Sequence, residues 1–196
     1  MGDEEISIGL KSETLLKGTL KVNKKNPSEA TILVDENKIR RIRESVAKNI
    51  KLLSPTEVFI QSLENMNRAI DGDQVVVQIL PTENWKSPSK KLIAFSDSSE
   101  NQKKDEDLGH ENSFYVTGCV VGVIKRNWRS YVATIQVDTD TNQRFVLCVP
   151  MDYKIPKIRI KILDIKNFEN QRILVNIDDW PEDSRQKDFF FKFFFF

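Results

Sequence analysis

The chain has 196 residues, of which 39% are hydrophobic, and its 30 Lys and Arg face 29 Asp and Glu to give a formal net charge of +1. This length suits one ordinary domain or two small ones, because domains commonly run to about 100–150 residues. The near-zero charge gives no sign of the strongly basic composition of many nucleic-acid binders. Two cysteines, Cys119 and Cys148, outside any CxxC or Cys/His cluster, exclude a disulfide framework and the usual zinc sites.

The chain begins with a polar segment and then alternates between strand and helix patterns. Residues 1–13 have no basic start followed by an apolar stretch, so we expect no secretory signal there and treat them as an N-terminal extension. Residues 15–22 and 30–34 are predicted strands, and Gly18 inside the first indicates a bulge or a close backbone approach. Residues 38–53 place apolar side chains at spacings of three and four, which predicts an amphipathic helix. Its basic residues are interpreted as a solvated face rather than an RNA contact.

The remaining elements of the first half lead to an acidic linker. Residues 56–61 alternate like a half-buried strand, and Asp71, Gly72 and Asp73 form a predicted turn that starts the apolar strand 74–80. Residues 96–112 hold six acidic residues against two lysines, whereas residues 14–95 carry 14 Lys and Arg against nine Asp and Glu. Residues 113–166 carry nine basic against four acidic residues. The small net charge therefore hides two basic bodies joined by an acidic linker.

The second half repeats the strand pattern. Two apolar runs, 115–124 and 132–137, flank the basic and aromatic segment 125–131, which predicts a hairpin. Further strands are expected at 144–149, 158–163 and 172–177. About four or five short strands in roughly 70–80 residues suit a small antiparallel barrel better than a sandwich. We therefore predict an all-β protein of two small β-barrels with a helical insertion in the first, covering residues 14–95 and 113–185.

One predicted loop combines the residue types that typically bind single-stranded RNA. Such RNA is typically held by cations that track phosphates and by aromatic faces that stack on bases. The segment 125–131 offers both, so we predict RNA contacts from Lys125, Arg126, Asn127, Trp128, Arg129 and Tyr131. The alternative is that Trp128 covers the end of the barrel and the cations are simply solvated.

Other candidates are more dispersed. In the first unit we predict RNA contacts from Asn67, Arg68, Trp85, Lys86, Lys21, Lys24 and Lys25. Asn67 and Arg68 precede a strand, so their alternative role is to cap a turn or brace the barrel. Trp180, next to Pro181, is interpreted as a packing residue. Neither the isolated pair Asp178 and Asp179 nor His110 in the acidic linker indicates a catalytic site.

Several motifs resemble one family in the same order. Residues 67–81 (NRAIDGDQVVVQILP) and 17–22 (KGTLKV) resemble the first cold-shock domain of the exosome-type exoribonucleases of the ribonuclease II (RNB) family, Dis-three type. Residues 117–131 (TGCVVGVIKRNWRSY) look like the opening hairpin of the second cold-shock domain. Residues 155–160 (IPKIRI) and 177–185 (IDDWPEDSR) are similar to its later blocks. The resemblance implies two OB-fold (cold-shock) barrels that guide single-stranded RNA, exosome core subunits as partners, and a place in nucleus and cytoplasm.

The departures from the family limit what the resemblance implies about catalysis. The family's PIN domain and its RNB domain, whose acidic residues hold Mg²⁺, have no counterpart in this sequence, so we predict no cofactor and no hydrolysis by this chain alone. Residues 186–196 replace the family's continuation with a Phe-rich tail, which we interpret as aberrant and too short to span a membrane, since that needs about 20 apolar residues. Two alternatives remain open, a protein-interaction module and a gene-model fragment without independent function.

Overall fold

The computed structural model describes residues 1–45, 51, 52, 54, 56–85, 113–136, 145–161, 171–177 and 180. Its contacts divide the chain into two compact units, Met1–Lys125 and Arg126–Phe196. This division differs from the predicted boundaries, because residues 113–125 belong to the first unit rather than the second. The reason lies in the strand pairing of the first unit.

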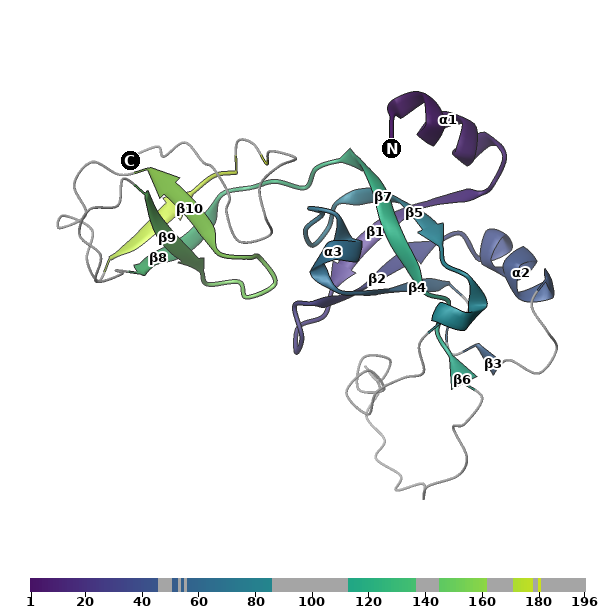
Figure 1. The fold of residues 1–196 in the computed structure, drawn as a ribbon. Coiled ribbons are helices and arrows are strands. Elements are labelled where there is room, and N and C mark those ends of the chain that lie inside the picture. Colours follow the sequence, from purple (N-terminus) through teal and green to yellow (C-terminus); the bar gives the residue numbers. More distant parts are fainter. Residues whose placement is uncertain are drawn as a thin grey trace, which may run out of the picture. The chain divides into compact units, whose positions relative to one another are not determined.

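The first unit is built on a five-stranded antiparallel sheet with the order β4-β2-β1-β5-β7 (Figure 1). The sheet closes on itself, because Phe59 in β4 forms a parallel bridge with Thr117 and its N–H donates to the Val116 carbonyl at 2.7 Å. A closed five-stranded barrel of this connectivity is an OB-fold. The strands are β1 (Leu15–Val22), β2 (Glu29–Val34), β4 (Glu57–Gln61), β5 (Gln74–Ile79) and β7 (Gly118–Lys125).

The predicted hairpin across residues 125–131 is wrong. Strand β7 pairs with β5 along Gln74–Ile79 and does not form a hairpin with the strand that follows it. Four strands would leave the edges of β5 and β4 unpaired, and an unpaired edge is a liability that closure removes. The apolar run 115–124 therefore completes the first barrel instead of opening the second.

Side chains that alternate inward along these strands form the core of the first barrel. The central members are Leu16, Leu20, Ile32, Val58, Ile60, Val75, Val77 and Val120. Gly18 lies where β1 and β2 come close, since an added Cβ would overlap the backbone carbonyl of Leu33 and meet Ile32 Cγ2 at 2.5 Å. The predicted close approach at Gly18 is thus confirmed.

The turn before β5 is also confirmed. Gly72 adopts φ 89°, a left-handed value that favours glycine. The Asp71 carboxylate accepts the Val22 N–H at 2.9 Å, and the buried Asp73 carboxylate accepts the Ile70 N–H at 3.0 Å. Both aspartates therefore tie the start of β5 to its surroundings.

In the described residues, three α-helices and several short elements accompany the first barrel (Figure 1). Of the helix predicted over residues 38–53, the structure describes α2 over Glu36–Ser45, whereas residues 46–50 and 53 lie outside the described residues. Lys51–Leu52 form a short strand, β3, parallel to β6 (Ser113–Phe114), so the helix prediction is wrong at these two residues. Helix α3 (Leu63–Met66) and the 3₁₀ turn η1 (Thr82–Asn84) lie in the connections on either side of β5.

A further helix, α1 (Asp3–Lys11), occupies the segment treated as an extension. It packs on the barrel through small residues: Cβ atoms built at Gly9 and Gly122 would lie 2.5 Å from Leu15 Cδ1 and Ile6 Cδ1, respectively. Gly122 pairs with Val76 of β5, so α1 covers that part of the sheet's outer face and explains the burial of Val76.

The second unit contains a four-stranded antiparallel sheet with the order β10-β9-β8-β11. Its strands are β8 (Tyr131–Gln136), β9 (Phe145–Pro150), β10 (Ile158–Lys161) and β11 (Arg172–Val175), each within a predicted strand or one residue from it. Ala133, Cys148, Ile158, Ile160 and Val175 are buried. The all-β class, with two antiparallel sheets and few helices, is as predicted.

Candidate nucleic-acid interface

The loop between β7 and β8, residues 126–130, holds a guanidinium against two indoles. Arg126 Cζ lies 5.1 Å from the ring centroid of Trp128 and 6.0 Å from that of Trp180. Cation–π attraction of this kind is worth about 0.5–2 kcal/mol depending on solvent exposure. Arg126 is thus held over one face of the Trp128 ring and is half-buried itself. Trp180 is buried, as its packing interpretation requires.

Trp128 is neither fully buried nor fully exposed. The residue is half-buried, and its Nε1 is fully buried with no acceptor within hydrogen-bonding distance among the described residues. The N–H edge of the indole therefore faces inward. A half-buried indole is compatible with both interpretations of the sequence, packing on the unit and stacking on a base.

A second cation of the loop is fixed in a similar way. Arg129 Cζ lies 5.6 Å from the Tyr131 ring centroid, and its Nη2 pairs with Asp152 Oδ2 at 3.5 Å. Tyr131 is only 5% exposed, so its ring supports Arg129 instead of being open to a base. Among the predicted contacts of this segment, Lys125 and Asn127 are exposed.

Lysines of the first unit gather at the turn between β1 and β2. Lys21, Lys24 and Lys25 are exposed. The buried Asn23 shapes the turn: its Oδ1 accepts the backbone N–H groups of Lys25 at 2.7 Å and Asn26 at 3.3 Å, and its Nδ2 donates to Glu29 at 3.2 Å. An asparagine that bonds its own backbone two residues on is a common turn-former. This side chain therefore determines where the two turn lysines project.

The other predicted residues of the first unit have structural roles or are not described. Trp85 is 5% exposed in the core, and its Nε1 donates to the Leu80 carbonyl at 2.8 Å. That burial argues against the predicted stacking role, because a base cannot reach the ring. Asn67 ends α3 in the left-handed conformation at φ 44°, and Arg68 follows at φ 62°, which agrees with the turn-capping alternative. Lys86 lies outside the described residues.

Burial changes the acidity of three groups near these sheets. It raises the pKa of the Cys148 thiol to about 12, from an ordinary value near 9. It also raises the pKa of the Cys119 thiol and, together with the nearby Glu57 carboxylate, that of the Tyr115 phenol. All three groups are therefore neutral at physiological pH, and the positive charge of the lysines and arginines is not offset by them.

Sequence reasoning missed two residues that organise these surfaces. Asn23 had a usable signal, since an Asn-initiated NKKN stretch between two strands is typical of a side-chain-stabilised turn. Asp152 had none, because it reaches Arg129 from a loop 23 positions away, and pairing at that separation depends on the fold.

Two family models match the chain. The Rrp44-like cold shock domain matches residues 5–150, and the Dis3-like cold-shock domain 2 (CSD2) matches residues 145–186. The human exosome complex exonuclease RRP44 is 34% identical over 191 residues, which cover 90% of this chain and 18% of that protein. The chain belongs to the Dis3/Rrp44 family. The resemblance in the sequence is confirmed, but residues 117–131 fall within the first cold-shock match and not the second.

Other Dis3/Rrp44 relatives agree. The Arabidopsis thaliana RRP44 homolog A is 32% identical over 204 residues, covering 92% of this chain and 20% of the relative. The Schizosaccharomyces pombe exosome exonuclease dis3 is 36% identical over 142 residues, covering 65% and 15%, respectively. The chain thus spans about a fifth or less of these relatives.

A solved structure supports the fold. Yeast Ssd1, described as a pseudonuclease, matches 98% of this chain and 24% of its own with a TM-score of 0.64 at 18% identity. At that identity the match concerns the fold alone. In the part of the chain that the structure describes, no helix has the length and apolar character needed to cross a membrane.

Proposed function

We propose that this chain binds single-stranded RNA as the cold-shock module of an exosome-associated 3′–5′ exoribonuclease. The observation that carries the proposal is the Arg126–Trp128 pair, a guanidinium held 5.1 Å over a half-buried indole in an exposed loop. This arrangement places positive charge for a phosphate next to an aromatic surface for a base. The Dis3/Rrp44 membership supports the same conclusion, since the relatives are named as exosome complex exonucleases.

The chemistry of each unit suits a flexible polyanion. Phosphate attraction needs exposed cations, which Lys21, Lys24 and Lys25 supply in the first unit and Lys125 at its end. Base stacking adds about 1–3 kcal/mol for each base and tolerates any sequence, because every base has an aromatic face. Asn127, exposed beside Trp128, offers an amide to a base edge. We propose that these residues bind RNA and guide it, and that hydrolysis is not their role.

The names of the relatives are the basis for the partners and the location that we propose. The named proteins are exosome complex exonucleases, so we propose exosome core subunits as partners and the nucleus and cytoplasm as locations. Which transcripts reach the module depends on those partners, because stacking and phosphate contacts select little by sequence.

The test is direct binding of the whole chain to a labelled, unstructured oligouridine at two salt concentrations. Phosphate contacts release counterions, so affinity should fall steeply between about 50 and 200 mM salt. No binding at low salt by the folded protein would refute the proposal and favour a protein-docking role for the basic surfaces. Binding that ignores salt would equally contradict phosphate recognition.

A further inference from the structure

A groove of about 360 Å³ lies on the outer face of the first barrel's sheet. Its lining comes from three strands and one helix: Lys17 and Thr19 of β1, Leu33 of β2, Gln74 of β5, and Asp35 and Lys38 at the start of α2. Lys17 and Lys38 were not among the residues that the sequence suggested for RNA contact.

Strand register places the floor of the groove. Thr19 pairs with Leu33 on one side and with Gln74 on the other, so these three residues form one row across the sheet. Lys17 is two residues from Thr19 on the same face of β1, because side chains along a strand alternate between faces. Lys17, Thr19 and Leu33 are exposed, whereas their neighbours Leu16 and Leu20 point into the core.

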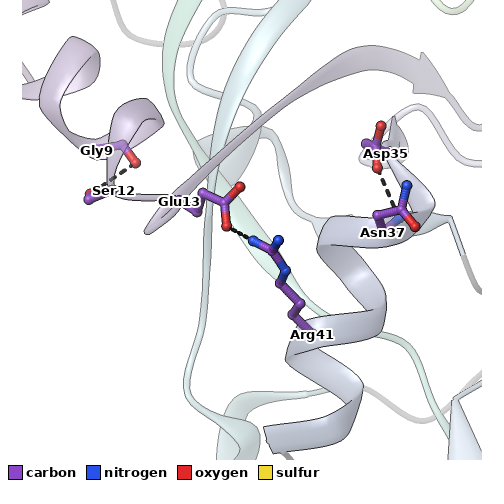
Figure 2. A network of polar contacts seen from close by, with 6 residues as sticks. All are labelled: Gly9, Ser12, Glu13, Asp35, Asn37 and Arg41. Carbon is purple, nitrogen blue, oxygen red and sulfur yellow. Dashed lines mark hydrogen bonds and ion pairs between the residues drawn. The ribbon is translucent and has the colours of Figure 1, made fainter.

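Helix α2 supplies one wall and is held by polar contacts at its start and middle (Figure 2). The Asp35 carboxylate accepts the Asn37 N–H at 2.9 Å, an N-terminal capping interaction that fixes the first turn, where Lys38 lies. One turn further, Arg41 pairs with Glu13, which comes just before β1 (Figure 2). The groove therefore has a fixed wall next to β1.

The balance of charge in the groove is positive. Neither Lys17 nor Lys38 forms an ion pair with any carboxylate that the structure describes. Asp35 is the one acid among the described lining residues, and it already accepts a backbone N–H and lies at the positive end of the α2 dipole. Two ammonium groups, a hydroxyl and an amide thus face a space that could hold an anion and a sugar.

The described lining of the groove includes no aromatic side chain. Of the aromatic side chains that the structure describes in the first unit, Phe59, Trp85 and Tyr115 are buried and Phe114 packs against the core. Phe59 and Tyr115 contact each other, with ring centroids 5.8 Å apart. Among the described residues, none offers a ring to a base brought to the groove, unlike Trp128 in the second unit.

We infer that this groove holds the sugar–phosphate backbone of single-stranded RNA without contacting its bases. The inference rests on the proposed RNA-binding function and adds a division of roles. Lys17 and Lys38 bind phosphate, Thr19 and Gln74 hydrogen-bond the backbone, and base recognition belongs to the loop with Trp128. The affinity of the groove should consequently be the same whether or not the ligand carries bases.

The experiment compares two labelled probes on the whole chain: oligouridine of about 20 nucleotides, longer than the roughly 4–16 bound by one OB-fold, and a phosphodiester oligomer of equal length with no bases. The test variant is Lys17→Ala/Lys38→Ala. Lys11→Ala/Lys157→Ala removes the same charge from exposed positions outside the groove and is the matched control. Lys17→Arg/Lys38→Arg keeps the charge. Trp128→Ala reports on the base-binding loop.

Single-strand contacts contribute about 0.7 each to the slope of log affinity against log salt, so Lys17→Ala/Lys38→Ala should make that slope shallower by about 1.4 on both probes. The control and the arginine variant should keep it. Trp128→Ala should weaken oligouridine binding alone. If the groove variant changes neither slope, or only that of oligouridine, while the wild type still binds RNA, the groove inference fails and the proposed function survives. A wild type that binds neither probe overturns both.

Discussion

Replacing Trp128 by alanine should weaken RNA binding without unfolding the second unit. Arg126 covers one face of the indole at 5.1 Å, which leaves at most one face for a base. One stack is worth about 1–3 kcal/mol, so the dissociation constant for oligouridine should rise about 5- to 150-fold. We expect the lower half of that range, because Trp128 is half-buried and its Nε1 edge faces inward.

The assay is fluorescence anisotropy with oligouridine, with thermal melts of each variant to confirm that it is folded. Trp128→Phe retains an aromatic plane and should lose less affinity than Trp128→Ala. Tyr153→Ala is the matched control, since Tyr153 is 57% exposed in the same unit but outside the loop, and it should bind like the wild type. If Trp128→Ala binds as tightly as the wild type while remaining folded, Trp128 does not stack on RNA and the loop loses its proposed role.

Three further outcomes are expected. Asn23→Ala removes a buried side chain that accepts two backbone N–H groups, so it should lower the free energy of unfolding by about 1–3 kcal/mol and weaken RNA binding through the turn lysines. Urea titration measures the first effect and anisotropy the second. An unchanged urea midpoint would contradict the role of Asn23 in stabilising the turn. Gly18→Ala should lower the free energy of unfolding by about 1–3 kcal/mol, because the added methyl meets the backbone of Leu33. The control Gly122→Ala should lower it less, because there the methyl meets only the flexible end of the Ile6 side chain. Equal urea midpoints for the two variants would contradict this difference. Burial raises the pKa of the Cys148 thiol to about 12, so the stability gained from burying the neutral thiol should be fully present below pH 9 and be lost as the pH rises toward 12. Rapid labelling of Cys148, as distinct from Cys119, in the folded protein near pH 8 would contradict this protection.

Local features of the first barrel could be predicted from the sequence, but its closure could not. The spans of β1 and of the turn at Asp71–Asp73 follow from alternation and from glycine, which act over a few residues. The pairing of β7 with β5 could not be predicted in this way, because alternation indicates that a segment is a strand but not which strand it pairs with. Strands next to each other in sequence pair most often, so the hairpin was the natural expectation, and barrel closure overrode it.

The candidate site shows the same division. Composition located the loop with Arg126 and Trp128, because cations and an aromatic side by side in a polar break are a local signal. Composition could not separate Trp128, which keeps solvent contact, from Trp85 and Tyr131, which are buried. Exposure depends on what packs against a ring, and that is a property of the fold. The position of Lys38 in the groove could likewise not be predicted from the sequence, because it depends on how α2 is held next to β1.

The most direct measurement of RNA recognition compares the affinity of the whole chain for one single strand with that for the matching duplex, at the same salt concentration. Exposed bases are available to the Trp128 ring only in the single strand, whereas the duplex offers a denser array of phosphates. We expect the single strand to bind more tightly despite its lower charge density, with the difference reduced in Trp128→Ala. Equal or tighter binding of the duplex would contradict base stacking and leave only unspecific attraction between charges.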